Sequence, residues 1–151
     1  MQIRGLSVPV GALCLAMLVS LAGCGGGGNG GPGAAGPNPF VITIATKNAT
    51  HPYFGQGDPV GLVVDGVQGG VINLTIGETY MFIVNTPSHP VYFTPDAVGG
   101  AGFPGRITTG VQNDQITSGT ITFTPDNTLP AQFFYQCGVH DNMGWMVMLS
   151  P

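Results

Sequence analysis

Short runs in which apolar and polar residues alternate are the feature that most restricts how this chain can fold. In the clearest of them every second residue is apolar: Ile72/Leu74/Ile76, Tyr80/Phe82/Val84 and Ile121/Phe123. A period of two is typical of strands that are buried on one face. No window of the sequence has the sustained period of 3.6 residues that an amphipathic helix requires.

Turn-forming residues separate the strand-like runs, as at Asp65-Gly66, Gly69-Gly70, Gly77-Glu78 and Thr124-Pro125-Asp126-Asn127. The runs cover residues 40–45, 60–67, 71–76, 80–85, 91–94, 119–124, 132–137 and 145–149. About seven to eight short strands at this spacing predict an all-β fold, a Greek-key β-sandwich. We place this single domain at residues 40–151.

The N-terminal segment reads as an export signal rather than as part of the domain. Arg4 is its only charged residue, and an apolar run over residues 8–21 leads to Leu21-Ala22-Gly23-Cys24. The run is short for a transmembrane helix. Leu-Ala-Gly-Cys resembles a bacterial lipoprotein box, which implies a signal peptide over residues 1–23 and a lipid on the thiol of Cys24. The alternative is an ordinary secretory signal followed by a chance cysteine.

Residues 24–39 are rich in Gly and Pro and predict a flexible linker. A random coil of this length reaches about 20 Å, so the segment is either a tether for a domain that moves or a simple spacer. We expect an exported protein that is anchored by lipid to the cell envelope. Gly25 after Cys24 would direct it to the outer membrane if the source is Gram-negative.

Charge argues against nucleic acid as a partner. Once the signal is removed, Lys47 and Arg106 are the only fixed cations against seven acidic residues, a net charge of −5. A chain without a basic patch lacks the electrostatic footprint of a nucleic-acid-binding protein.

Cysteine usage singles out Cys137. Cys14 lies in the predicted signal and Cys24 is the predicted lipidation site, so Cys137 is alone in the folded domain. Exported proteins normally pair their cysteines, and a lone thiol outside the cytoplasm is open to oxidation unless it is buried or bound to a metal. This favours Cys137 as a metal ligand.

Candidate partners for that thiol lie nearby in the sequence. Cys137, His140 and Met143 follow one another with the spacing Cys-x2-His-x2-Met, between two strand-like runs. His89 lies in an inter-strand turn 48 residues before Cys137. A thiolate and two imidazoles with a weak axial thioether are the ligands of a type 1 copper site.

At these residues the sequence resembles the cupredoxins, the plastocyanin, amicyanin and pseudoazurin group of blue copper proteins. The resemblance covers roughly residues 40–149; the short Cys-x2-His-x2-Met loop is most similar to that of amicyanin, and Ser88-His89-Pro90 matches the first histidine of the family. It implies a Greek-key sandwich, one type 1 copper and outer-sphere electron transfer through an exposed His140.

One position departs from the family. Cupredoxins usually have Asn after the first histidine, and its backbone N–H donates to the copper thiolate. Pro90 stands there and has no N–H. Because donors around a ligand tune the metal, we predict a lower reduction potential than in a site that has this donor.

Each candidate ligand also has an ordinary structural explanation. Cys137 can be a buried structural thiol, Met143 can fill the core, and His89 before Pro can be a turn residue. All of these would have to coincide at cupredoxin spacing for the copper interpretation to fail. We expect His51 to be a surface or loop-packing residue rather than a ligand, and Trp145 to pack under the loop that precedes it.

Three functions fit these observations. The first is a monomeric electron carrier whose redox partner the sequence does not identify. The alternatives are a copper module for storage, delivery or sensing, and a metal-free cupredoxin-like binding or scaffold domain. An enzyme is not expected, because three histidines in the whole chain are too few for a multicopper oxidase and no hydrolase motif occurs.

Overall fold

The computed structural model describes residues 39–151 and contains no helix in that range. The predicted signal peptide, Cys24 and the predicted linker as far as residue 38 lie outside it. Accordingly, residues 39–151 hold no helical segment that is long and apolar enough to cross a membrane. The ten strands are β1 (Phe40–Thr46), β2 (Val60–Val64), β3 (Val67–Gln68), β4 (Ile72–Thr75), β5 (Tyr80–Asn85), β6 (Val91–Thr94), β7 (Val111–Gln112), β8 (Ser118–Phe123), β9 (Gln132–Cys137) and β10 (Trp145–Ser150).

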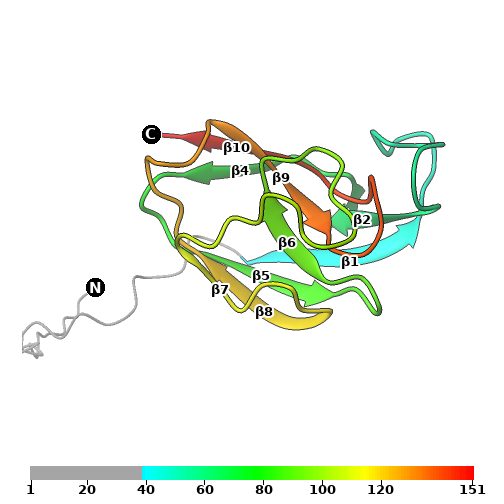
Figure 1. Cartoon of the computed structure of the whole chain (residues 1–151), viewed down its shortest axis with the longest axis horizontal. Helices are drawn as coiled ribbons and strands as arrows, with labels where there is room; N and C mark the ends of the chain where they lie inside the picture. Colours follow the sequence, from blue (N-terminus) through cyan, green and yellow to red (C-terminus); the bar gives the residue numbers. More distant parts are fainter. Residues whose placement is uncertain (1–38) are drawn as a thin grey trace, which may run out of the picture. The chain divides into compact units, whose positions relative to one another are not determined.

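The strands form two sheets, as Figure 1 shows. One has the order β3-β2-β1-β5-β8-β7 and the other β4-β10-β9-β6. Both are mixed, because β1 runs parallel to β5 and β4 runs parallel to β10, whereas the other pairs are antiparallel. The predicted all-β class is confirmed, and the pair of sheets fits a β-sandwich. The sequence missed β3 and β7 as separate strands, since two residues are too short to show a period.

The core lies between the two sheets and is drawn from both. Phe93 of β6 is fully buried at its centre, with ring centroids 5.1 Å from Phe82, 4.8 Å from Phe123 and 6.4 Å from Phe133. Phe82 and Phe123 belong to the larger sheet and Phe133 to the smaller one. Burying an aromatic or aliphatic side chain of this size contributes about 2–3 kcal/mol, so these rings hold the sheets together.

The pairing of β6 with β9 brings the predicted ligands together. The two strands are antiparallel, with Val91 opposite Cys137. The residues that precede β6 therefore lie beside those that follow β9. The N–H of Gly138 accordingly donates to the carbonyl of Pro90 at 2.9 Å. In this way the sheet register juxtaposes two segments that are far apart in sequence.

Candidate metal site

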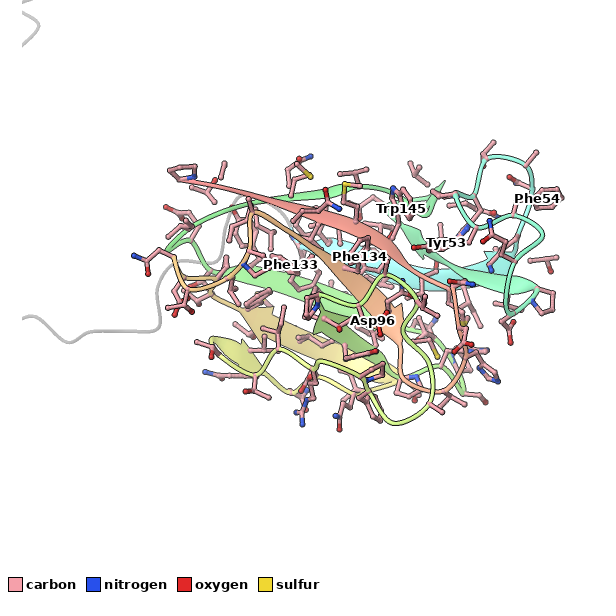
Figure 2. The ribbon with its side chains drawn as sticks, turned by 45° about the horizontal axis from the view of Figure 1, so that its top comes forward. Tyr53, Phe54, Asp96, Phe133, Phe134 and Trp145 are labelled. Atoms are coloured by element: carbon pink, nitrogen blue, oxygen red, sulfur yellow. The ribbon has the colours of Figure 1, made fainter. Side chains whose placement is uncertain are left out.

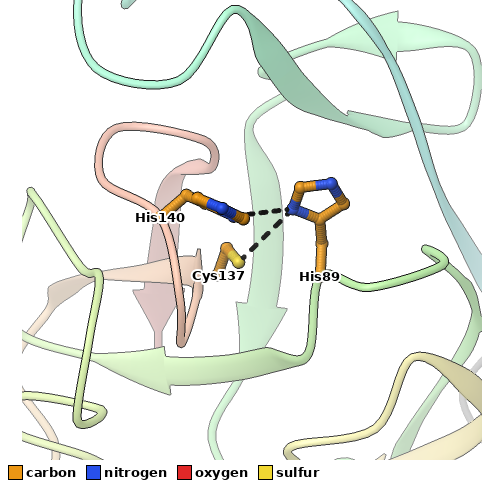
Figure 3. Close-up of side chains that lie close together, drawn as sticks. All are labelled: His89, Cys137 and His140. Atoms are coloured by element: carbon orange, nitrogen blue, oxygen red, sulfur yellow. Dashed lines mark hydrogen bonds between the residues drawn. The ribbon is translucent and has the colours of Figure 1, made fainter.

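His89, Cys137 and His140 converge so that one donor atom from each lies within 4.8 Å of the others. The Nδ1 atoms of the two imidazoles are 3.1 Å apart, and Cys137 Sγ lies 3.8 Å from His89 Nδ1. Figure 3 shows both rings turned toward each other above the thiol. Without a metal, two nitrogens at this distance can share one proton, with one ring donating and the other accepting.

The separations suit a single metal ion. Metal bonds of about 2.0 Å to nitrogen and about 2.3 Å to sulfur allow two nitrogens to lie up to about 4 Å apart, and a nitrogen and a sulfur up to about 4.3 Å. The observed 3.1 Å and 3.8 Å fall inside these limits. The three side chains can therefore hold a metal ion. A thiolate among imidazoles selects a soft or borderline metal over magnesium or calcium.

His89 is presented by a tight turn. The N–H of His89 donates to the carbonyl of Thr86 at 2.9 Å, and the buried Thr86 hydroxyl donates back to the His89 carbonyl at 2.7 Å. Pro87 occupies the second position of this turn, and Ser88 occupies the third with a φ of 68°. Proline followed by a positive φ is the pattern of a type II turn. The turn fixes the backbone from which the imidazole projects.

The loop that carries the other candidate ligands, residues 138–144, is held on one side by the 95–106 loop. The N–H of Gly100 donates to the carbonyl of Cys137 at 2.9 Å. The N–H of Asn142 donates to the carbonyl of Val98 at 2.7 Å. These bonds join main-chain atoms, so they fix the path of the backbone whatever the side chains are.

On the opposite side, residues of the 47–59 loop and of β2 hold the 138–144 loop. The N–H of Asp58 donates to the carbonyl of Asp141 at 3.2 Å, and the N–H of Leu62 donates to the carbonyl of Met143 at 2.6 Å. The 138–144 loop is therefore braced from two directions by segments that are distant in sequence. A metal site benefits from such support because its ligands must be placed before the ion arrives.

Burial influences the protonation of two candidate ligands, Cys137 and His89. Cys137 is fully buried, and this burial raises the pKa of its thiol, while the backbone N–H groups of His140 and Val139 oppose that rise. Burial also lowers the pKa of His89, and the neighbouring His140 lowers it further against a smaller opposing effect of Asp58. The metal-free site thus favours a neutral thiol and a neutral imidazole, and metal binding would release the thiol proton.

The sulfur of Cys137 is reached by backbone N–H groups of its own loop in spite of Pro90. The N–H of Val139 lies 3.4 Å from Sγ and points to it. Pro90 lacks an N–H and instead uses its carbonyl to hold Gly138. The position after the first histidine therefore supports the backbone of the 138–144 loop, while the donor to the sulfur comes from that loop itself.

Met143 lies in the hydrophobic core, fully buried, six positions after Cys137. The sequence allowed it to be an axial ligand or a core residue, and its burial suits both. Its main chain is fixed through its carbonyl, which accepts a hydrogen bond from the N–H of Leu62.

Gln136 is a supporting residue that sequence reasoning missed. Its buried side chain accepts from the N–H of Gly144 at 2.8 Å and donates to the carbonyl of Ala97 at 2.6 Å. It thereby links the 95–106 loop to the end of the 138–144 loop. The sequence signal that could have revealed this role is a glutamine immediately before the cysteine, on a strand that packs in the core. A buried amide needs hydrogen-bond partners at both its oxygen and its nitrogen.

His51 and Trp145 both take part in the packing of the 47–59 loop. The His51 side chain is buried, with 2% of the residue exposed, so it is a loop-packing residue and not a surface one. Trp145 is the first residue of β10. Its ring lies edge-on to Tyr53, 5.0 Å between centroids, and Figure 2 shows the two beside each other. The 47–59 loop is thus packed against the start of β10.

His140 is the candidate ligand that reaches the surface. Its side chain is 40% exposed, and its Nε2 lies 3.8 Å from Asp58 Oδ2. A shallow depression of about 370 Å³ surrounds it, lined by Gly57, Asp58, Ala101, Val139, His140 and Asp141. The cluster therefore has a buried thiol on its inner side and an accessible imidazole on its outer side.

Comparison of the chain with models of protein families, with curated proteins and with solved structures gives no significant match.

Proposed function

We propose that this chain is a cupredoxin-like electron carrier with one type 1 copper, held by His89, Cys137, His140 and Met143 in a Greek-key β-sandwich. The observation that carries the proposal is the convergence of two imidazole nitrogens and one buried thiol within 4.8 Å. Bound there, copper would supply a one-electron couple. The proposal includes export and a lipid anchor at Cys24.

The residues around the cluster have distinct parts in this function. Cys137 supplies a soft ligand from a buried position, and the brace of two loops keeps the donors in place. A rigid set of ligands changes little between oxidation states, which keeps the cost of reorganisation low. The exposed edge of His140 offers a partner protein close access to the centre. Burial of the thiol keeps water away from the sulfur.

The experiment is titration of the purified protein with Cu(II), followed by visible spectroscopy. We expect an intense thiolate-to-copper charge-transfer band at one equivalent, and its loss in Cys137→Ser. Reversible one-electron voltammetry should then accompany the band. A protein that takes up no copper, or that gives the same spectrum with serine at position 137, would overturn the proposal.

Copper delivery is a second candidate, favoured by the exposure of His140 and the open depression beside it. An accessible ligand gives a competing protein a route to the metal. Exchange with a competing chelator separates the two functions, because a delivery protein should release copper quickly and an electron carrier should retain it.

A further inference from the structure

His51 is the histidine that the copper proposal leaves unused, and its hydrogen bonds define its state. The N–H of Tyr53 lies 3.1 Å from His51 Nδ1, and a backbone N–H can only donate. His51 Nδ1 is therefore the acceptor and carries no proton. The proton of the neutral ring is on Nε2, which lies 3.1 Å from the carbonyl oxygen of Met143 and donates to it. Both ring nitrogens are engaged.

The Met143 carbonyl oxygen receives two hydrogen bonds from different segments. One comes from the His51 ring at 3.1 Å and the other from the N–H of Leu62 in β2 at 2.6 Å. A carbonyl oxygen has two lone pairs, so its capacity is filled. The peptide group between Met143 and Gly144 is thus fixed from two directions.

Gly61 makes room for the His51 ring. A Cβ on Gly61 would stand 2.6 Å from both Cδ2 and Nε2 of His51, closer than real Cβ atoms approach such neighbours. Gly61 lies inside β2, where glycine weakens a strand relative to alanine. Close approach of the ring explains a glycine at that point. The fold thus accommodates His51 at some cost to the strand.

We propose that His51 is a positioning residue: it fixes the main chain of Met143 and so sets where the Met143 thioether stands relative to His89, Cys137 and His140. This rests on the proposed function in treating Met143 as a ligand. It adds that the 47–59 loop, which carries no candidate ligand, controls where the Met143 side chain stands. His51 acts through Met143 and does not itself bind the metal.

Two substitutions separate the two hydrogen bonds of the ring. In His51→Gln the side-chain amide nitrogen can reach the place of Nε2 and keep the bond to Met143. In His51→Asn the shorter amide can replace Nδ1 and keep the bond from Tyr53, but it cannot reach Met143. Tyr135→Phe is the matched control, because it removes another buried hydrogen bond, from the Tyr135 hydroxyl to the carbonyl of Gly70 at 2.8 Å.

The first readout uses metal-free protein. Amide exchange at Leu62 and the NMR signal of the Met143 methyl group report on the Met143 peptide. We expect His51→Asn to raise the Leu62 exchange rate about tenfold beyond its effect on global unfolding and to broaden or shift the methyl signal. His51→Gln should stay within about threefold of the parent protein. Tyr135→Phe should change Leu62 exchange only as far as it changes global unfolding.

The second readout uses copper-loaded protein. His51→Asn should alter the charge-transfer spectrum and the reduction potential, whereas His51→Gln and Tyr135→Phe should retain those of the parent protein. If His51→Asn does not fold, Gly61→Ala takes its place, because the added methyl group displaces the ring without removing it, and the same changes are expected.

The inference is overturned if His51→Asn and Tyr135→Phe have equal effects at Leu62 and Met143 once global stability is matched, or if His51→Gln behaves as His51→Asn does. Failure of the proposed function is a separate result. A parent protein without a copper band would remove the copper proposal, while the metal-free readout would still decide whether His51 positions Met143.

Discussion

The carbonyl of Pro90 and the N–H of Gly138 are joined by a 2.9 Å hydrogen bond, which ties the residue after one candidate ligand to the residue after another. His89 and Cys137 are thereby held at a fixed separation through their neighbours. The proline therefore contributes through its carbonyl at a position where an N–H was expected to matter.

The N–H of Val139, one backbone donor to the sulfur, can be removed by Val139→Pro. This substitution deletes the N–H that lies 3.4 Å from Cys137 Sγ and leaves the sulfur more electron-rich. The oxidised site should gain stability relative to the reduced one. A hydrogen bond worth about 1 kcal/mol corresponds to about 40 mV in a one-electron couple, so voltammetry should show a fall of that order. Val139→Ala keeps the N–H and should leave the potential unchanged.

Met143→Leu distinguishes a ligand from a core residue. Leucine has nearly the same volume, so the free energy of unfolding of metal-free protein should change by less than about 1.5 kcal/mol. If the thioether is the axial ligand, the charge-transfer spectrum and the potential of copper-loaded protein should change clearly. Met148→Leu, at an exposed methionine of the same C-terminal region, is the control and should change neither. Identical spectra for all three proteins would make Met143 a core residue only.

Gln136→Leu tests the link between the two loops. It leaves the N–H of Gly144 and the carbonyl of Ala97 without their partner, and an unsatisfied buried group costs about 1–3 kcal/mol. The free energy of unfolding should fall by about 2–5 kcal/mol in denaturant titration. Gln132→Leu, at the exposed first residue of the same strand, should stay within about 0.5 kcal/mol of the parent protein. Equal losses in both variants would contradict the assigned role.

Ser88→Gly should stabilise the turn that carries His89. Ser88 has a φ of 68°, a conformation that costs an L-residue about 1–2 kcal/mol and glycine nearly nothing. After the entropy that glycine adds to the unfolded chain, a gain of about 0.5 kcal/mol is expected, measurable as a higher midpoint of denaturation. Ser118→Gly, at the first residue of β8, should have the opposite sign. A loss of stability in Ser88→Gly would mean that the serine side chain has an unrecognised contact.

Stability should fall at alkaline pH because of buried tyrosines. Burial raises the pKa of Tyr92 to about 12, so the unfolded chain ionises this hydroxyl near pH 10 while the folded chain keeps it neutral. The folded state therefore keeps its full free energy of unfolding below the pKa that the tyrosine has in the unfolded chain. Part of that free energy is lost as the pH rises from about 10 toward 12. Each such tyrosine adds up to about 1.4 kcal/mol per pH unit to the slope. Tyr92→Phe should flatten the dependence of the unfolding free energy on pH in metal-free protein, whereas an unchanged slope would exclude Tyr92 as its source.

Local pattern accounts for the parts of the fold that were anticipated. The alternation in Tyr80/Phe82/Val84 matches β5, where Phe82 and Val84 are buried and Met81 and Ile83 are exposed. The grouping of His89 with Cys137 could also be anticipated, because an inter-strand turn and a strand end can meet at one end of a sandwich. The structure places both next to each other through the β6/β9 register.

The parts that were not anticipated depend on contacts between distant residues. No local pattern shows that His51 donates to Met143 across 92 positions, or that the Gln136 amide reaches Ala97. The departure at Pro90 was visible in sequence, but the donor from Val139 was not, since the direction of its N–H depends on the path of the 138–144 loop. Strand pairing across the sheets, including the parallel pairs, likewise arises only from tertiary packing.

The brace around the 138–144 loop has a consequence for how this surface can be redesigned. Its bonds to Gly100, Val98, Asp58 and Leu62 use backbone atoms on both sides. The exposed side chains of Val139 and Asp141 take no part in those main-chain bonds. The exposed side chains around His140 can therefore be substituted to suit a different partner while the 138–144 loop keeps its backbone path. Partner recognition and the geometry of the loop can thus be engineered separately.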